Sequence, residues 1–379
     1  MNAKSFNGFT INEISNKLSD CLTDGFKPTM AFVFLSVSQD RVAIRELFSE
    51  HEIQIFGVTT NGEFIDENVE KGSASILLLD MNPEYFKIHF QPFVAKNYRE
   101  VAGLIANKGK SQFKNPAFLL STSHPSSDGE EILRGLESII GEDVKAFGSA
   151  AGDDFSFTDT YVFTNGIEHN EALICLIIDA DKIQVEGIAT CGWKAVGTEK
   201  TITRSEGNHV YTIDNEPAVD IITKYGGLEN ITPESKDLLM ELAANFPLQL
   251  QREKGDPVMR PPLVVDWTDR SFFTSGTLPE GSKVRFSLPP DWDVMEKVVL
   301  SVKELKAKKM PEADAVVVFS CAGRLLTLGP LMTEELEGIH NVWNVPMVGM
   351  FSNAELGRAT GGNLEMHNLT ACAVALREK

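Results

Sequence analysis

Residues 57–63 read GVTTNGE, and residues 349–355 read GMFSNAE. Each stretch begins with a glycine that directly follows a short apolar run and ends with a glutamate. A third version, GSAAGDD at 148–154, has the same leading glycine and acidic residues five and six positions later. An apolar run followed by turn-forming residues is typical of a buried strand that ends in a turn. The three versions indicate an internal duplication.

The segments around these turns predict strand-helix-strand units. Residues 30–35 are apolar without alternation, as in strands buried on both faces, and residues 53–58 have the same character. Between them, residues 42–48 gather their apolar side chains on one face of a helix. The order recurs from residue 117 and from residue 315. Because short joints favour parallel crossovers, we expect an α/β protein with two domains of mixed, largely parallel sheets flanked by helices.

The stretch between the second and third versions has a different character. Its expected elements are strands at 183–193 and 201–213, helices at 217–225 and 233–244, and short strands joined by tight turns across 255–290. A chain of 379 residues also exceeds what one core usually organises. The change in composition places a domain junction near 180–220, and we expect domains at 28–215 and 216–376.

Composition excludes several classes of protein. A net charge of −19 argues against nucleic acid or an anionic membrane surface as a partner, because both attract basic faces. The sequence has no run of about 18 apolar residues to span a membrane, and its first residues lack the pattern of a secretory signal. We therefore expect a cytoplasmic protein. The 5 cysteines are scattered without a C-x-x-C pair, which indicates reduced thiols rather than a zinc site.

The repeated turns are candidate ligand contacts. In sheets with parallel strands, ligands bind beyond the carboxyl ends of the strands, where loops and helix N-termini present unpaired backbone N–H groups. Glycines there allow close approach, while asparagine and glutamate offer amide and carboxylate groups. The alternative is that each turn only reverses the chain, with its acidic side chain accepting backbone N–H bonds. Recurrence fits both interpretations, because a duplicated fold duplicates its turns.

Five parts of the sequence resemble, in family order, the FIST sensory proteins. They are MAFVFLS with IFGVTTNGEF, then AFGSAAGDD, then the segment that begins TCGWKAVGTEK, then LPEGSKVRFSLP with AVVVFSCAGR, and finally VGMFSNAELG with MHNLTACAVAL. The resemblance covers nearly the whole chain and implies a FIST N-terminal domain at 28–215 and a FIST C-terminal domain at 216–376. Two residues depart from the family pattern: Ala354 stands where Gly62 stands in the first version, and Thr60 takes a place often held by a smaller residue.

The resemblance implies a non-enzymatic sensory protein of signal transduction. Such a protein binds a small ligand, such as an amino acid. As a stand-alone member of the family, this chain is expected to pass its signal to a separate protein such as a histidine kinase, because no kinase or receptor segment is visible in its sequence.

The turns that match the family best are also the best candidates for ligand binding. We expect the first and last turns to share one pocket that suits an ammonium and carboxylate pair. Arg324, just after the strand expected at 315–320, has the planar fork that binds a carboxylate bidentately, although a surface ion pair is an equal alternative. The expected ligand contacts are Thr59, Thr60, Asn61, Glu63, Asp153, Arg324, Ser352, Asn353 and Glu355.

Two further classes of function compete with the small-ligand sensor. Some stand-alone FIST proteins bind haem to detect nitric oxide and regulate a histidine kinase, and the best match for an axial ligand is His367, followed by His124. Without a C-x-x-C-H motif, such a haem b would be bound non-covalently. An enzyme is the third class, and it is disfavoured because the sequence has no G-x-x-x-x-G-K-[ST], G-x-G-x-x-G, H-E-x-x-H or G-x-S-x-G motif.

Overall fold

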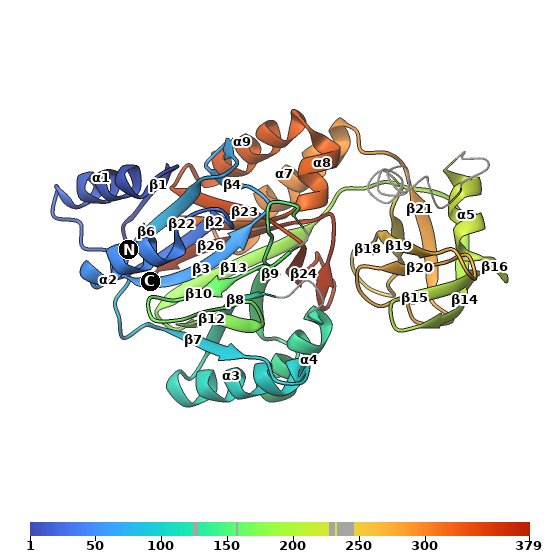
Figure 1. Cartoon of the computed structure of the whole chain (residues 1–379), viewed down its shortest axis with the longest axis horizontal. Helices are drawn as coiled ribbons and strands as arrows, with labels where there is room; N and C mark the ends of the chain where they lie inside the picture. The colour runs from blue at the N-terminus through green and yellow to red at the C-terminus, as the bar shows by residue number, and fades with distance from the viewer. Residues whose placement is uncertain (124–127, 157, 227–231, 233–245) are drawn as a thin grey trace.

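The computed structural model of the chain describes residues 1–123, 128–156, 158–226, 232 and 246–379 (Figure 1). These residues form a large α/β body and a smaller lobe of strands at one side of it (Figure 1). The helix expected at 233–244 and the candidate ligand His124 lie outside the described residues. No helix in the described part of the chain is both long and apolar enough to cross a membrane.

The body consists of three consecutive parts of the chain. The elements of the first part are β1 (Ala3–Gly8), α1 (Ile11–Leu22), β2 (Met30–Ser36), α2 (Arg41–Glu50), β3 (Gln54–Thr60), β4 (Glu63–Ile65), β5 (Asn68–Glu70) and β6 (Ala74–Leu79). The strands predicted at 30–35 and 53–58 and the helix predicted at 42–48 are confirmed. Asp40 begins α2 because its carboxylate accepts a hydrogen bond from the backbone N–H of Ala43.

The second and third parts have a similar order of elements. The second contains β7 (Phe86–Pro92), α3 (Tyr98–Gln112), β8 (Pro116–Thr122), α4 (Gly129–Ile140), β9 (Lys145–Ala150), β10 (Val162–Phe163), β11 (Glu168–His169) and β12 (Ala172–Asp179). The third contains β13 (Ile183–Thr190), α7 (Trp292–Lys308), β22 (Ala315–Cys321), α8 (Ala322–Leu328), α9 (Leu331–Trp343), β23 (Met347–Ser352), β24 (Ala354–Arg358), β25 (Leu364–His367) and β26 (Ala371–Glu378).

The three parts exchange hairpins. The sheet of the first part has the strand order β1-β6-β2-β3-β10-β11, so the second part supplies its last two strands. The order β7-β12-β8-β9-β24-β25 completes the second sheet with a hairpin of the third part. The order β13-β26-β22-β23-β4-β5 completes the third sheet with a hairpin of the first part. Each sheet of the body therefore depends on a neighbouring part for its last two strands.

The expectation of largely parallel sheets was wrong. Among the described strands, the parallel pairs are β2 with β3, β8 with β9, and β22 with β23, and each pair is joined through helix. The other described pairs, including those with β6, β12 and β26, are antiparallel. An apolar run predicts that a strand is buried on both faces but carries no information about the direction of its neighbours.

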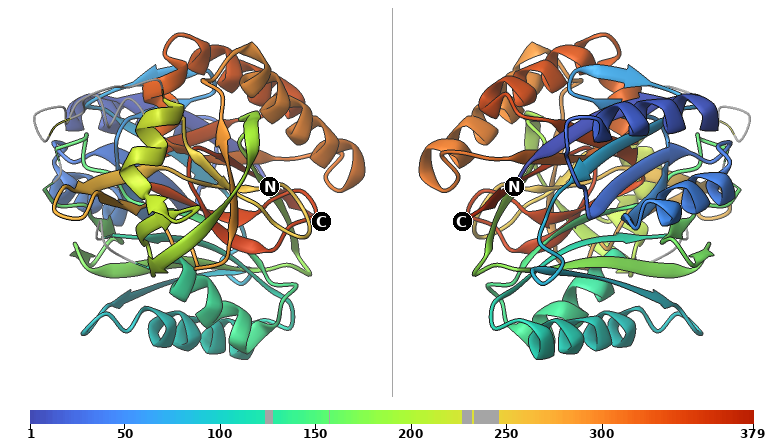
Figure 2. Two further views of the ribbon diagram at one scale, coloured as in Figure 1. Left: turned by 90° about the vertical axis from the view of Figure 1, so that its right-hand side faces the viewer. Right: turned by 90° about the vertical axis from the view of Figure 1, so that its left-hand side faces the viewer.

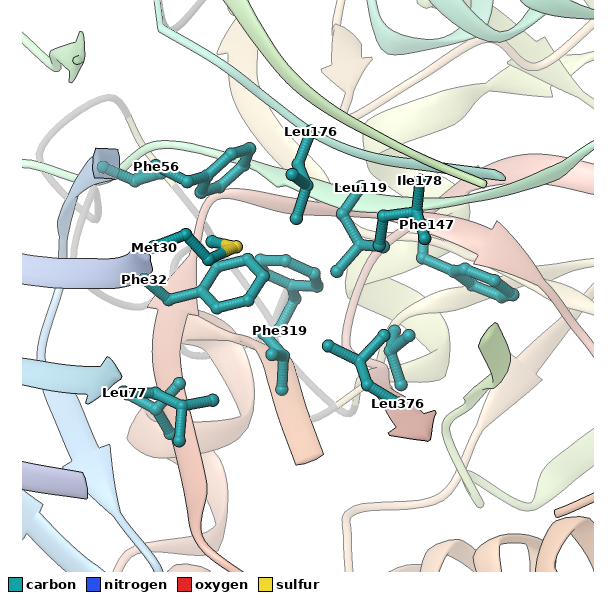
Figure 3. Close-up of a cluster of buried hydrophobic side chains, with 14 of the residues drawn as sticks. Met30, Phe32, Phe56, Leu77, Leu119, Phe147, Leu176, Ile178, Phe319 and Leu376 are labelled. Atoms are coloured by element: carbon teal, nitrogen blue, oxygen red, sulfur yellow. The ribbon is translucent and has the colours of Figure 1, made fainter. Parts of the chain in front are cut away.

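The inner faces of the three sheets share one core (Figure 3). Phe32 and Phe34 of β2 point into it, and the ring of Phe34 lies edge-on to that of Phe319 of β22, with centroids 5.9 Å apart. Val33 and Leu35, the alternate residues of β2, face outward and pack against α1 and α2. Helices cover the outer faces of the body (Figure 2). Both faces of β2 are thus apolar because one meets the shared core and the other meets helices.

The lobe is inserted between β13 and α7. Its elements are β14 (Ala195–Glu206), β15 (His209–Ile213), β16 (Glu216–Pro217), α5 (Ala218–Tyr225), β17 (Leu248–Leu250), β18 (Val258–Arg260), β19 (Pro262–Asp266), β20 (Ser271–Thr274) and β21 (Lys283–Ser287). The described strands pair antiparallel in the order β18-β17-β21-β14-β15-β20-β19. The boundary expected between residues 215 and 216 falls inside this lobe, between β15 and β16.

The turns after β3, β9 and β23 meet in a closed cycle of backbone hydrogen bonds. The three bonds run from Asn61 N to Phe351 O at 2.9 Å, from Asn353 N to Ala150 O at 3.0 Å, and from Gly152 N to Thr59 O at 2.8 Å. Each turn therefore donates to one neighbour and accepts from the other. We call residues 59–63, 150–154 and 351–355 the turn ring. The three turns thus have similar sequences because each forms the same pair of backbone hydrogen bonds with its neighbours.

Side chains reinforce the turn ring. Asn61 Nδ2 donates to Asn353 Oδ1 at 2.8 Å, and Asn61 Oδ1 accepts from the backbone N–H of Asp153 at 3.1 Å. Gly152 allows this close approach, because a Cβ atom at this position would lie 2.5 Å from Asn61 N. The ring therefore requires a glycine in the second turn.

A methyl group at Gly152 should loosen the turn ring. We expect Gly152→Ala to lower the free energy of unfolding by about 1–3 kcal/mol, because the backbones must separate to admit it. The matched control is Gly166→Ala, where a Cβ atom would meet nothing within 4 Å. Urea unfolding followed by circular dichroism measures both variants. Equal midpoints for the two variants would show that the ring tolerates separation.

Candidate functional site

Two glutamates of the turn ring are fully buried. The carboxylate of Glu63 accepts hydrogen bonds from Thr60 Oγ1 at 2.7 Å, Ser73 N at 2.6 Å and Ser73 Oγ at 2.8 Å. Burial raises the pKa of Glu63 to about 7, although these donors oppose the shift. The carboxylate thus ties its turn to the residue that precedes β6.

Glu355 has the corresponding place in the third turn. Its carboxylate accepts from Ser352 Oγ at 2.8 Å and from Thr370 Oγ1, just before β26, at 2.7 Å. Burial raises the pKa of Glu355 to about 8. In the second turn Asp153 is 3% exposed, and its Oδ2 accepts from the backbone N–H of Thr158 at 2.6 Å. The acidic side chains of the three turns therefore all have partners within the chain.

Arg324 lies in the interior. Its Nε donates to Glu335 Oε1 at 3.0 Å, and its second terminal nitrogen also contacts the Glu335 carboxylate. The remaining nitrogen donates to the carbonyl oxygens of Cys191 at 2.8 Å and Leu369 at 3.0 Å. Both members of the ion pair are fully buried, so the pair is not the surface contact considered as an alternative. The guanidinium has three protein partners and holds the chain where it leaves β13 for the lobe.

A cavity of about 590 Å³ lies between the body and the lobe, within the size range of small-molecule sites. On the body side it is lined by Thr122 at the end of β8, Asp128 and Gly129 at the start of α4, and Ala150, Asn353 and Ala354 of the turn ring, with Leu356 and Met366 beside them. On the lobe side it is lined by Gly207, Asn208, Leu263, Val264 and residues 273–277. The cavity therefore lies at the carboxyl ends of body strands, where the sequence predicted a ligand.

A polar bridge supports one wall of this cavity, to which it contributes Glu130 and Thr277. Arg260 of the lobe is fully buried and donates to Glu130 Oε1 of α4 at 2.6 Å. Thr277 Oγ1 donates to the other oxygen of Glu130 at 2.5 Å. Arg260 also donates to the carbonyl oxygens of Met259 and Met366, at 3.0 and 3.1 Å. These bonds join α4 and β25 to the lobe. Beyond the wall lies a second cleft of about 720 Å³, which shares Glu130 and Thr277.

The structure brings some of the expected ligand contacts together and leaves others apart. Asn61 and Asn353 touch each other in the turn ring, as a shared pocket for the first and last turns would require. Of the nine expected contacts, Asn353 lines the described cavity and is exposed. The other eight do not line it: Thr59, Thr60, Asn61, Glu63, Asp153, Arg324, Ser352 and Glu355.

The lobe side of the cavity and Asp128 are absent from the sequence-based set of contacts. Asp128 is visible in the sequence as a helix cap, which gives no sign that its carboxylate also faces a cavity. The available signal for the lobe was the pair of turn-like stretches Gly207-Asn208 and Ser275-Gly276-Thr277. Neither stretch indicates that it folds back onto α4.

His367 does not fit the role of a haem ligand. The side chain is 1% exposed, and its Nε2 lies 3.1 Å from the carbonyl oxygen of Gly357. Burial and the nearby Arg260 lower the pKa of His367 to about 4. It lines neither of the two cavities. The residues present around His367 therefore do not support a haem site.

Comparison with known proteins identifies the family. The model of the FIST N domain matches residues 29–216, and that of the FIST C domain matches residues 218–358. The chain belongs to the FIST family. FIST domains are sensory domains of signal transduction that bind small ligands. No curated protein matches this FIST protein. A crystal structure of cyanuric acid hydrolase from A. caulinodans covers 100% of this chain and 99% of its own, at 7% identity and a TM-score of 0.39, a likeness too weak to indicate an activity.

The buried glutamates should make the stability of this FIST protein depend on pH. Both carboxyl groups have a higher pKa folded than unfolded, so the folded chain binds their protons more tightly. Their stabilisation is complete below about pH 4.5 and is lost as the pH rises to about 8, because ionisation must then occur in the interior. The loss should reach roughly 3 kcal/mol for Glu63 and roughly 4–5 kcal/mol for Glu355, because each pKa unit corresponds to about 1.4 kcal/mol.

Neutral variants test this dependence. Glu63→Gln and Glu355→Gln should each flatten the fall in unfolding free energy between pH 5 and 8, measured by urea unfolding. Glu337→Gln, on the exposed side of α9, is the matched control and should keep the wild-type slope. If both buried variants keep that slope too, the carboxyl groups ionise at their ordinary pKa.

Proposed function

We propose that this chain is a small-ligand sensor whose ligand occupies the 590 Å³ cavity between body and lobe. The observation that supports this proposal is that the two walls of the cavity come from different parts of the molecule, the body and the lobe. One wall comes from strand ends, the start of α4 and the turn ring. The opposite wall comes from the lobe: Gly207, Asn208, two residues of β19, and β20 with the residues that follow it. A ligand that contacts both walls stabilises the arrangement in which they face each other. Ligand binding thereby changes the position of the lobe relative to the body that is most stable.

Within this proposal the expected ligand contacts have two different tasks. Asn353 contacts the ligand, because it is exposed and lines the cavity. The other turn residues hold it in position, through the Asn61 amide and the bonds of Glu63, Asp153 and Glu355. Arg324 holds the connection between β13 and the lobe through the carbonyl oxygen of Cys191. A mutation in these supporting residues would therefore weaken ligand binding by displacing the cavity wall.

The signal leaves the protein through the lobe and its contacts in this proposal. The bond from Arg260 to Glu130 joins the lobe to α4. A ligand bound beside this bond therefore affects the positions of both the lobe and α4. The receiver is a separate protein, for which the family resemblance suggests a histidine kinase.

Hydrogen exchange locates the ligand. A thermal-shift screen of small metabolites first supplies a stabilising compound, because a ligand that binds only the folded state must stabilise it. Amide exchange of the full chain is then measured with and without that compound. We expect added protection both in peptides around Asp128 and in peptides around Thr274. Protection confined to the body, or to the first turn around Asn61, would contradict the proposed cavity.

A pair of variants separates the cavity from the rest of the surface. Val264→Trp narrows the cavity from the lobe side and should lower the affinity of the compound at least tenfold. Val42→Trp places the same bulk on α2, where Val42 is 55% exposed, and should leave the affinity unchanged. Equal affinities for the two variants would place the ligand elsewhere.

A further inference from the structure

We propose that the ligand of this cavity is a protonated amine with an apolar body. The inference rests on the proposed function, because it concerns the chemistry of the same cavity. Its grounds are the hydrogen-bonding groups, the charge and the apolar surface that the described lining presents.

Most hydrogen-bond donors among the polar side chains of the described lining are engaged within the chain. The Ser275 hydroxyl, which accepts from Asn368 Nδ2 at 2.8 Å, and the second amide hydrogens of Asn208 and Asn353 remain for a ligand. The engaged donors are Thr122, to Ser123 O at 2.9 Å; Asn208, to Thr274 O at 3.0 Å; Thr274, to Gly276 O at 2.8 Å; Thr277, to Glu130 at 2.5 Å; and Asn353, to Ala151 O at 2.7 Å. Each threonine hydroxyl has one hydrogen, which is thereby used. The oxygens of these side chains retain capacity as acceptors. The lining therefore offers more acceptors than donors, and it suits a ligand rich in donors better than an anion.

The charge of the lining also favours a cationic ligand. Asp128 caps α4, and one carboxylate oxygen accepts from the backbone N–H of Glu131 at 3.0 Å. The positive end of the helix dipole therefore already has its anion. Burial raises the pKa of Asp128, and the neighbouring carboxylates Glu130 and Glu131 raise it further. A ligand cation beside Asp128 would relieve this repulsion. The described residues that line the cavity include no lysine, arginine or histidine.

The rest of the lining is apolar. Leu263 and Val264 of the lobe and Leu356 and Met366 of the body face the cavity together with Phe273. One face of the Phe273 ring is stacked on His209, with centroids 3.9 Å apart. These side chains can bury a hydrocarbon body while the ammonium group lies beside Asp128.

An amino acid fits this cavity less well than the corresponding amine. Its carboxylate needs a cation or several donors, because an unpaired buried carboxylate is strongly destabilising. The two buried arginines that could pair with a ligand carboxylate already have partners. Arg260 donates to Glu130 and to three carbonyl oxygens, and Arg324 donates to Glu335 and to two carbonyl oxygens. The expectation of a ligand with an ammonium and carboxylate pair therefore gives way, in this proposal, to a ligand with the ammonium alone.

Matched probes test the charge of the ligand. Isothermal titration calorimetry of the full chain at low salt uses amines from butylamine to 2-phenylethylamine, the carboxylate of each carbon skeleton, and phenylalanine. We expect at least one amine to bind at least tenfold more tightly than its carboxylate and than phenylalanine. Asp128→Asn should reduce that affinity at least tenfold, since asparagine keeps the helix cap but removes the charge. Asp40→Asn, which alters the cap of α2, is the matched control and should have no effect.

The outcomes distinguish this inference from the function on which it rests. A carboxylate or phenylalanine that binds more tightly than the amines and is weakened by Val264→Trp overturns the amine proposal but leaves the cavity as the ligand site. Amine binding that Asp128→Asn does not weaken also overturns the amine proposal. If every compound that stabilises the protein binds Val264→Trp as tightly as wild type, both the amine proposal and the proposed function fail.

Discussion

The three turns of the ring constrain each other because each one both donates and accepts a backbone hydrogen bond. A displacement of any turn breaks bonds to both neighbours, so the three sheets cannot shift separately. The hairpins that follow the turns extend this constraint, since each pairs in the sheet of another part. The position of Asn353 beside the cavity is set by this arrangement. The candidate site therefore depends on contacts between residues from all three parts of the chain.

Two kinds of buried charge support the body, and they act differently. In the described part of the chain, Glu63 and Glu355 accept from hydroxyl and N–H groups and form no ion pair, so burial favours their protonated forms. Arg324 and Glu335 form a buried ion pair, in which each charge is compensated by the other. The hydroxyl-bonded carboxyls fasten turns to strands within the body, whereas the ion pair fastens the body to the start of the lobe. The interior is thus organised by polar contacts as well as by its apolar core.

Local features of the sequence predicted local structure. The apolar runs at 30–35 and 315–320 are the strands β2 and β22, and the spacing of Ile132, Leu133 and Leu136 is that of α4. Strand β1 is weaker as a signal, because most of its residues are only half-buried. The antiparallel majority could not be predicted, because an apolar run does not show the direction of the neighbouring strand, as for β6, β12 and β26, and because the exchanged hairpins pair with strands far away in the chain. The first turn was recognised in the sequence, but nothing there showed that the strand after it, β4, pairs with β23.

The contacts expected from the sequence and the residues that line the cavity overlap only in part. Sequence placed a ligand at the carboxyl ends of strands and named Asn353, which lines the cavity there. The opposite wall comes from the lobe, which is joined to α4 by the bond from Arg260 to Glu130, 130 residues apart in the chain. Arg324 has the chemistry of a ligand contact, and only the tertiary structure shows that its guanidinium is engaged by Glu335. Side-chain chemistry alone does not reveal which partners are already present.

The exchange of hairpins has a consequence for synthesis on the ribosome. The hairpin β4–β5 leaves the ribosome early, but its partner β23 lies near the end of the chain, with Asp66 and Met347 separated by 281 residues. The second hairpin, β10–β11, emerges after the first sheet that it completes, whereas β4–β5 must wait for the third. A nascent chain therefore carries an unpaired strand edge through most of translation, and such edges attract other strands. The last-made part of the protein closes the fold, so a prematurely terminated chain is left with open sheets.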